Sequence, residues 1–305
     1  MSSNAGSMLV ADSGSTKTEW CLVTATGEKT SCFTDGLNPY YHTPESIEAI
    51  LREKLIPEIG TDNVPEIHFY GAGCTGDDRS VMLDNVLKKV FGAGLVEVQS
   101  DVLGAVRAVC GHKRGIAGIL GTGANTCLYD GEKIIDNVPV LGFILGDEGS
   151  AGYFGRKLLQ SYFYREMPGD LKKAMENQFD MNRSTILENV YKKEHPNRYV
   201  AGFARFTGEH ATHPYIKSIM RAGFTEAIER HILKYEGAKQ IQVGFVGSVA
   251  YYHSDLLRSV LLGKGLQPGL IIKNPMQNLI LYHRQTHKRH PERSPEQSEG
   301  RSRRA

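Results

Sequence analysis

The stretch MLVADSGSTKTEWCLV, residues 8 to 23, sets how the chain begins to fold. An apolar run ends at Ala11, a short segment of small and polar residues follows from Asp12 to Lys17, and a second apolar run begins at Trp20. Two such runs around a polar turn are typical of a β-hairpin. The turn ATGEK, residues 25 to 29, extends the pattern, so we predict three antiparallel strands over residues 8 to 33.

The first turn has the composition of a phosphate-binding turn. Small residues from Ser13 to Ser15 let an anion approach backbone N–H groups closely, and Thr16 and Lys17 add a hydroxyl and a positive charge. A Walker A loop is excluded because only one glycine precedes the lysine. A plain polar β-turn explains the same residues, and for this turn alone that alternative stays open.

The same order of elements returns at residue 115. An apolar strand, Gly115 to Leu120, leads into the turn GTGAN (121–125), and further strand patterns follow at 126–129 and 133–136. Thr122 is a hydroxyl donor in this second turn, and two glycines allow close backbone approach. We infer an internal duplication. A pair of facing turns is able to grip a polyphosphate from both sides, which favours the phosphate-binding interpretation of each.

Strand and helix patterns alternate along much of the remaining chain. Strands are predicted at 67–70, 96–99 and 241–246, helices at 79–91, 102–110 and 249–262, a helix start at Thr43-Pro44, and mostly helix over 150–236. This alternation predicts an α/β fold. We place one domain at 1–112 and a second at 113–285, and expect a disordered basic tail at 286–305, which is rich in Arg, Glu, Ser and Pro.

Composition narrows the class of protein. Of 305 residues, 36 are basic and 34 acidic, and the last 20 residues hold six of the former and three of the latter, so the body has no excess of positive charge for nucleic acid. No apolar run approaches the roughly 20 residues that a bilayer crossing needs. The five cysteines lack metal or disulfide spacing, so we expect reduced, mostly buried thiols. With no secretory signal visible, we expect a cytoplasmic protein without nucleic-acid or membrane partners.

Three acids stand where catalytic side chains often lie. Asp101 follows a predicted strand and precedes a helix, so it is either an ordinary N-cap or a general base. In LGDEGSAGYFG (145–155), Asp147 and Glu148 either favour a helix N-terminus or accept hydrogen bonds from substrate hydroxyls. The Gly247-Ser248 turn ends a strand, where a base or ribose is able to lie close to the backbone.

Taken together, six segments resemble the sugar kinase, heat-shock chaperone and actin superfamily. They are DSGSTKTEW (12–20), SDVLGA (100–105), GTGAN, LGDEGSAGYFG, RYVAGFAR (198–205) and VGFVGSVA (243–250). Within it, they look most like the N-acetylglucosamine kinases grouped with the BadF/BadG/BcrA/BcrD ATPases, over about residues 8 to 285. The resemblance implies two ribonuclease-H-like (actin-like ATPase) domains with an interdomain cleft, and binding of ATP, Mg²⁺ and a small sugar.

The resemblance also assigns roles to particular residues. Asp101 would be the catalytic base and Asp12 would help to hold hydrated Mg²⁺. ATP would contact Ser15, Thr16, Lys17, Thr122, Gly123, Ala201, Gly247 and Ser248. The sugar would contact Asn38, Asn125, Gly142, Asp147 and Glu148. The expected reaction is transfer of the γ-phosphate to a sugar hydroxyl, with O6 of N-acetylglucosamine or a related hexose as acceptor, and a homodimer is expected because similar proteins often dimerise.

Two departures from the family keep alternatives open. Val140 and Leu141 stand where relatives carry a tryptophan in the sugar loop, and the chain ends that region with NPMQNLILYHRQ rather than with a small-residue helix. One alternative is an ATPase activator of the BadF type, although the cysteine motif that bridges its iron–sulfur cluster is not found in this sequence. The other is a non-catalytic sugar sensor on the same fold.

Overall fold

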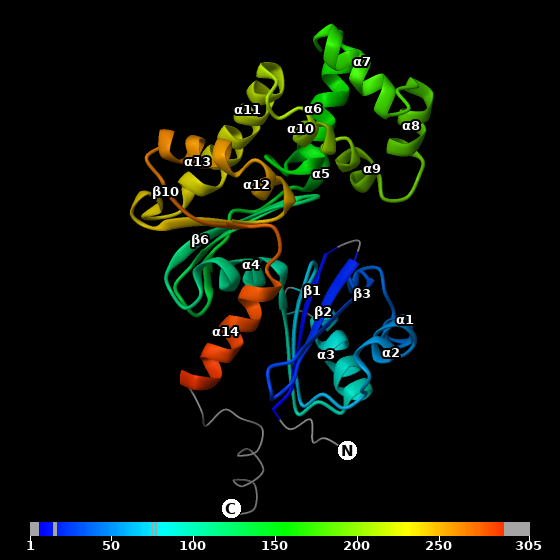
Figure 1. Cartoon of the computed structure of the whole chain (residues 1–305), viewed down its shortest axis with the longest axis vertical. Coiled ribbons are helices and arrows are strands. Elements are labelled where there is room, and N and C mark those ends of the chain that lie inside the picture. The colour runs from blue at the N-terminus through cyan, green and yellow to red at the C-terminus, as the bar shows by residue number, and fades with distance from the viewer. Residues whose placement is uncertain (1–5, 15–16, 75, 77, 290–305) are drawn as a thin grey trace, which may run out of the picture. The chain divides into compact units, whose positions relative to one another are not determined.

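A computed structural model describes residues 6–14, 17–74, 76 and 78–289. The chain divides after Gly111 and again after Asn274. Unit 1 contains the N-terminal part together with the segment that starts at Pro275, and unit 2 contains residues 112–274. Each unit is built on its own β-sheet (Figure 1).

The sheet of unit 1 has five strands among the described residues, in the order β3-β2-β1-β4-β5. Their bounds are β1 (Met8–Ser13), β2 (Lys17–Val23), β3 (Lys29–Asp35), β4 (Glu66–Gly71) and β5 (Leu95–Ser100). The first three form an antiparallel meander, and β4 and β5 run parallel to β1. The predicted meander over residues 8 to 33 is thereby confirmed.

Helices cover both faces of this sheet, and the two faces differ in chemistry. The helices are α1 (Pro44–Ile50), the π-helical turn η1 (Leu51–Leu55), α2 (Ile56–Ile59), α3 (Asp78–Phe91), α4 (Asp101–Cys110) and α14 (Met276–Arg289). One face carries Leu9, Trp20 and Phe69 in an apolar core with α1, η1, α2 and α3. Because side chains alternate along a strand, His68 and Tyr70 of β4 lie on the opposite face, beneath α4 and α14.

Unit 2 repeats the strand order of unit 1. Its strands are β6 (Gly115–Leu120), β7 (Ala124–Tyr129), β8 (Ile134–Asp136), β9 (Gln242–Val246) and β10 (Gln267–Ile272), in the order β10-β9-β6-β7-β8. Here β6, β7 and β8 correspond to β1, β2 and β3, and β9 and β10 to β4 and β5. The predicted duplication is confirmed at the level of the fold.

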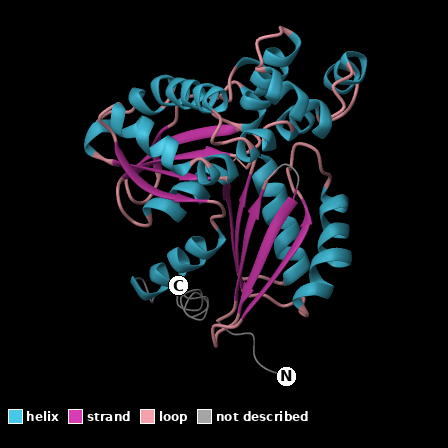
Figure 2. Cartoon of the chain, turned by 45° about the horizontal axis from the view of Figure 1, so that its top comes forward, coloured by secondary structure: helices cyan, strands magenta, loops and turns pink. Residues whose placement is uncertain are grey.

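Most of the described helices belong to unit 2, as the predicted helical region over 150–236 required (Figure 2). They are α5 (Gly142–Leu145), α6 (Ala151–Phe163), α7 (Gly169–Gln178), α8 (Arg183–Tyr191), α9 (Pro196–Gly202), α10 (Arg205–Glu209), α11 (Pro214–Arg230), η2 (Ile232–Lys234), η3 (Ala238–Gln240), α12 (Ser248–Tyr252) and α13 (Ser254–Gly263). The core of unit 2 joins sheet residues such as Ile116 and Phe245 to helix residues such as Phe154, Phe224 and Leu257.

The C-terminal region differs from the prediction in two ways. Residues 275–285 belong to unit 1 rather than to the second domain, and helix α14 continues to Arg289, four residues into the segment expected to be disordered. The physical reason is burial: Met276, Leu279 and Ile280 recur at helical spacing and are almost fully buried, with α14 packed against α4 and β1. The remainder of the predicted tail, 290–305, lies outside the described residues.

The structure also describes the state of the cysteines and the length and apolar character of the helices. All five cysteines lie in the described part of the chain and form no disulfide, and Cys110 is the one that is not buried. Over the same residues, no helix combines the length and apolar character that a bilayer crossing requires.

Candidate functional site

Three parallel strands of unit 1 end at the same level. The register pairs Ser13 of β1 with Gly71 of β4, and Gly71 with Ser100 of β5. Asp12 lies one residue before this edge and Asp101 one residue after it. Ligands of open α/β sheets bind at the carboxyl ends of parallel strands. Two acids that are 89 positions apart in the sequence are thus brought to one edge.

The pKa values of both acids at this edge are raised. Burial raises the pKa of Asp12 to about 7, the charges of Asp101 and Glu19 add to the rise, and Lys17 opposes it. Burial also raises the pKa of Asp101, even though its Oδ1 accepts a 2.8 Å hydrogen bond from the N–H of Val102. Carboxylates gathered in this way favour a shared proton or a bound cation.

The ordinary capping role proposed for Asp101 is taken by its neighbour. Ser100 is the N-cap of α4, and its Oγ accepts a hydrogen bond from the N–H of Leu103 at 3.3 Å. Asp101 is the first residue of the helix itself. The N-cap alternative is therefore wrong, although the Asp101 carboxylate does accept from the N–H of Val102 in the first turn of α4. Its role as a general base stays a prediction.

The loop after β3 is hydrogen-bonded to the first hairpin at this edge of the sheet. The N–H of Leu37 donates to Ser13 Oγ at 3.0 Å. Asn38 follows, and its Oδ1 accepts from the N–H of Tyr40 at 2.9 Å. A Cβ on Gly73 would lie only 2.7 Å from the same Asn38 oxygen, and Gly73 has a φ of 83°, so glycine is required there for both reasons.

The other residues predicted in the first hairpin are less informative. Lys17 is exposed, and its Nζ lies 4.5 Å from the centroid of the Phe33 ring on β3. Ser15 and Thr16 lie outside the described residues. The phosphate contacts predicted for this turn stay predictions.

The second glycine turn is fixed to the start of α6. Within the turn, the N–H of Gly121 donates to the carbonyl of Gly123 at 3.0 Å. The N–H groups of Ala151 and Gly152 donate to the carbonyls of Gly121 and Thr122, at 2.8 and 3.0 Å. The turn predicted to bind phosphate is therefore a rigid part of unit 2, held between β6, β7 and the first turn of α6.

Gly247 lies at the same sheet edge as this turn. The register pairs Ile119 of β6 with Val246 of β9, so both strands end together. Gly247 has a φ of 122°, and a Cβ there would stand 2.4 Å from the carbonyl oxygen of Leu120. Only glycine satisfies both conditions. Ser248 follows as the exposed first residue of α12.

Ala201 is linked to the turn through α6. It lies on α9, next to Val200, and a Cβ on Gly155 of α6 would stand 1.9 Å from the Val200 carbonyl oxygen. Helix α9 thus lies directly against α6, whose first residues hold the glycine turn.

Asp147 has a left-handed backbone, with a φ of 57°. This conformation costs a non-glycine residue about 1 kcal/mol or more. Its Oδ1 accepts from the N–H of Ala124 at 3.4 Å, and its Oδ2 lies 3.0 Å from where a Cβ on Gly123 would stand. Burial raises the pKa of Asp147. The strained residue therefore directs a buried carboxyl at the glycine turn, and binding of sugar by Asp147 stays a prediction.

Glu148, the next residue, is turned toward protein partners. It is 6% exposed; its Oε2 lies 3.0 Å from Nε2 of His231, and its Oε1 lies 3.5 Å from Nε of Arg230. Burial alone would raise the pKa of Glu148, but these two neighbours lower it. Sequence reasoning missed them because His231 is 83 residues away, at the end of α11. Binding of sugar by Glu148 stays a prediction, and its visible role is to anchor the loop.

Asn125 also has a protein partner that the sequence did not indicate. Its Oδ1 accepts from the N–H of Thr126 at 2.8 Å and from Nδ2 of Asn137 at 3.1 Å. The Asn137 amide donates to the Thr126 carbonyl as well. These contacts hold the Asn125 side chain in one orientation at the start of β7.

The loop around Gly142, which is predicted to contact sugar, has an exposed aliphatic surface. Gly142 opens α5 with a φ of 72°, and Arg156 donates from NH1 to two backbone carbonyls of α5, at 2.8 and 2.7 Å. Leu141, Ile144 and Leu145 are 63%, 69% and 72% exposed. Aliphatic side chains therefore occupy the loop in which the expected tryptophan is missing.

Comparison with solved structures identifies proteins of the same architecture. The putative N-acetylglucosamine kinase of Porphyromonas gingivalis is 39% identical, with a TM-score of 0.87, and the match covers 92% of this chain and 99% of that one. The corresponding protein of Chromobacterium violaceum, also named a putative N-acetylglucosamine kinase, is 15% identical over 92% and 99%, with a TM-score of 0.72. No family model and no curated protein matches the chain.

More distant matches share the fold alone. The ROK family glucokinase of Streptomyces griseus, solved with glucose and AMPPNP, is 16% identical over 91% of this chain and 98% of its own, with a TM-score of 0.55. A MamK mutant bound to AMPPNP matches with a TM-score of 0.54. Two mixed five-stranded sheets with this strand order are the common feature.

Proposed function

This chain belongs to the family of the Porphyromonas gingivalis protein, within the two-domain actin-like ATPase fold, and from that premise we propose that it is an ATP-dependent sugar kinase. The acceptor is an amino sugar or hexose, with N-acetylglucosamine as first candidate, and the γ-phosphate is transferred to its O6 hydroxyl. The name of the relative and the glucose and AMPPNP of the glucokinase structure support this assignment.

The pairing of Asp12 and Asp101 at one sheet edge is the observation on which the proposal depends most. Phosphoryl transfer needs alignment of the acceptor, neutralisation of phosphate charge and a group that accepts the acceptor's proton. A raised pKa makes the Asp101 carboxylate a stronger base than an exposed aspartate. We assign it as the residue that takes the proton from the sugar hydroxyl.

Asp12 fits a role as ligand of hydrated Mg²⁺. Burial raises the pKa of Asp12, and the charges of Asp101 and Glu19 add to the rise, with Lys17 as the opposing charge. A divalent cation would offset both the burial of the Asp12 carboxylate and the repulsion from the two neighbouring acids, and when bound it supplies neutralisation of the phosphate charge.

Unit 2 contributes a second set of contacts. The backbone of Thr122 and Gly123 would bind phosphate, and Gly247 and Ser248 would border the adenosine. Asp147, strained and directed at the turn, would accept hydrogen bonds from sugar hydroxyls. Arg230 and His231 act on Asp147 indirectly, because they anchor the adjacent Glu148.

The function is tested with a panel of acceptors. ADP release is measured with glucose, mannose, N-acetylglucosamine and N-acetylmannosamine, and the products are analysed by mass spectrometry and phosphorus NMR for the position of the phosphate. We expect N-acetylglucosamine 6-phosphate. ATP hydrolysis without any phosphorylated sugar, or sugar binding by calorimetry without turnover, would contradict the proposal.

The role of Asp101 is tested by Asp101→Asn, which keeps the shape of the side chain and removes the base. We expect kcat to fall by about 10² or more while ATP affinity stays within about threefold. Asp62→Asn, at an exposed aspartate of unit 1, is the matched control and retains wild-type kcat. Undiminished turnover in the Asp101 variant would show that another group accepts the proton.

A further inference from the structure

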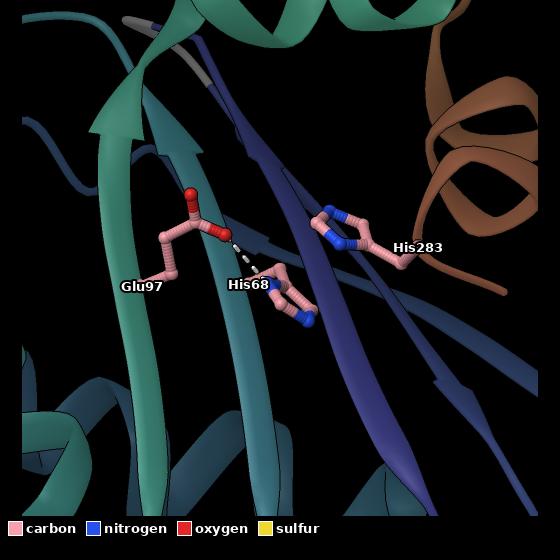
Figure 3. A group of neighbouring side chains, drawn as sticks. All are labelled: His68, Glu97 and His283. Atoms are coloured by element: carbon pink, nitrogen blue, oxygen red, sulfur yellow. Dashed lines mark hydrogen bonds and ion pairs between the residues drawn. The ribbon is translucent and has the colours of Figure 1, made fainter. Parts of the chain in front are cut away.

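A cluster of polar side chains is buried beneath α14 in unit 1, and none of them is among the residues assigned to catalysis. Figure 3 shows its centre: His68 from β4, Glu97 from β5 and His283 from α14. The strand register pairs His68 with Glu97, and alternation along β4 places Glu66 and Tyr70 on the same face as His68. Sequence analysis indicated none of these residues as functional.

His68 is held between two carboxylates. Its Nε2 lies 2.6 Å from Glu66 Oε1, and its Nδ1 lies 2.9 Å from Glu97 Oε2. Burial alone would lower the pKa of His68, but both carboxylates raise it. Because a carboxylate oxygen lies within hydrogen-bond distance of each ring nitrogen, the geometry favours a ring with a proton on both nitrogens. Arg107 of α4 donates to Glu97 Oε1 at 2.8 Å. Among the contacts that the structure describes, two negative and two positive groups therefore balance in the cluster.

His283 accepts a hydrogen bond at the end of a chain of donors. Arg107 NH1 donates to the hydroxyl of Tyr70 at 2.7 Å, and that hydroxyl lies 2.8 Å from His283 Nε2. Burial raises the pKa of Tyr70, so the phenol keeps its hydrogen and donates it to the ring. The His283 ring stacks on His68, with centroids 3.5 Å apart and planes at 17° (Figure 3). This arrangement suits a neutral His283 over a charged His68.

The geometry favours a proton over a metal ion. Donor atoms of His68, Glu97 and His283 lie within 4.8 Å of one another, a set that zinc accepts. Each imidazole directs its lone pair in its own ring plane, however, and two nearly parallel stacked rings do not direct theirs at a common point. A divalent ion would also leave positive charge unbalanced in a buried site.

We propose that His283 is a proton-dependent latch for α14: the neutral ring holds the helix on the sheet, and protonation of His283 releases it. A second imidazolium would stack 3.5 Å from the first, and Tyr70 would lose the acceptor of its hydrogen. The latch is present at neutral and higher pH and is lost as the pH falls. This inference does not depend on the kinase function.

Other titratable groups border the latch. They are Arg107 from α4, Tyr282 from α14, Glu97 from β5, Glu66 and Tyr70 from β4, and Asp12, paired in register with Tyr70, from β1. Arg284 of α14 instead directs its guanidinium at the turn between β2 and β3, with NH2 3.2 Å from where a Cβ on Gly27 would stand. Arg107 adds positive charge near His283 and so strengthens its expected release on acidification. Glu66 and Glu97 are both engaged by His68.

The latch is tested by hydrogen exchange of the full chain at pH 8 and pH 5, with protection factors corrected for the intrinsic pH dependence of exchange. We expect amides of α14 to lose at least about tenfold in protection at pH 5 relative to those of α3, which lies in the same unit and reports any change in its overall stability. His283→Gln still offers an acceptor to Tyr70 and does not titrate, so the ratio of α14 to α3 protection is the same at both pH values. His213→Gln, at a half-exposed cap in unit 2, behaves as wild type.

Three results would overturn the proposal. One is a ratio of α14 to α3 protection in wild type that is the same at pH 8 and pH 5, and another is the same loss in wild type and His283→Gln. The third is stoichiometric zinc binding by chelator-treated wild type that His283→Gln abolishes, because the cluster would then be a metal site. If the variant does not fold, histidine NMR titration of the wild-type chain replaces it: His283 must gain its proton over the pH range in which α14 loses protection.

Discussion

Asp12 lies in an environment very different from that of an exposed aspartate. Its pKa of about 7, against an ordinary value of 3.8, arises first from burial and then from Asp101 and Glu19. Half of its population would be protonated near neutral pH in the absence of a cation. Mg²⁺ would compete with that proton for the Asp12 carboxylate. Binding of the proposed metal would therefore change the stability of unit 1.

Asp12→Asn tests this link without an activity assay. The folded protein keeps a proton that the unfolded chain loses above pH 4, so wild-type stability falls as the pH rises from about 4 to 7. We expect the variant to be more stable than wild type at pH 8 by about 2 kcal/mol and equal to it near pH 4. Urea denaturation at both pH values measures the difference.

Magnesium and a control acid complete the experiment. Excess MgCl₂ at pH 8 is expected to stabilise wild type but not Asp12→Asn. Glu28→Gln, at an exposed position after β2, is expected to follow wild type in every condition. A difference between Asp12→Asn and wild type that is the same at pH 4 and pH 8 would show that the carboxyl is not protonated as described.

At the level of elements, the close contact between helices α6 and α9 helps to hold the second glycine turn in place. A Cβ on Gly155 would lie 1.9 Å from the Val200 carbonyl oxygen and 3.4 Å from Val200 Cγ1. Backbone cannot move aside as a flexible side chain does, so the two helices would have to separate. Because α6 starts at the turn itself, separation would also disturb Thr122 and Gly123.

Gly155→Ala is therefore expected to lower the free energy of unfolding by about 1–3 kcal/mol, although alanine favours helix more than glycine does. Gly208→Ala in α10, where a Cβ meets nothing within 4 Å, is the control and is expected to be neutral or stabilising by up to about 1 kcal/mol. Chemical denaturation measures both. Equal effects in the two variants would refute the role of close helix approach.

At the scale of the whole molecule, unit 1 is built from two segments that are far apart in the sequence. Substitutions in either segment are therefore expected to change its stability. Helix α14 follows β10 of unit 2 in sequence but buries its apolar side chains in unit 1. The segment NPMQNLILYHRQ therefore does provide a closing helix on the first unit, although the sequence differs from the small-residue helix expected of relatives. A substitution near residue 280 is thus expected to weaken the N-terminal unit.

Two leucines of α14 make this testable. Leu279 is 0% exposed and Leu281 is 55% exposed. Leu279→Ala is expected to cost about 2–4 kcal/mol, whereas Leu281→Ala is expected to cost less than about 0.5 kcal/mol. In hydrogen exchange, the Leu279 variant should lose protection in β4 and β5 but not in β6 and β9. Loss of protection confined to unit 2 would contradict the division of the chain.

Local patterns in the sequence were enough to predict most elements of both units. The meander over 8–33, the capped start of α1 at Thr43, the strands at 67–70 and 96–99 and the repeated glycine turn are all found. These features are set by periodicity and turn chemistry within a few residues, which a sequence displays directly. Strand β10 was missed because Pro268 and Gly269 weaken a strand pattern, and both are tolerated since the strand lies at the sheet edge.

The sequence also indicated the candidate acids, but it did not indicate which distant residues lie next to them. Strand register brings Asp12 and Asp101 to one edge, His231 reaches Glu148 from 83 residues away, and His283 of α14 stacks on His68 of β4. Which distant segments meet depends on burial of whole faces, and this depends on the summed packing of many side chains rather than on local spacing. The sequence by itself therefore determined the elements and the residue types at the site, whereas the tertiary structure alone decided which charges face each other.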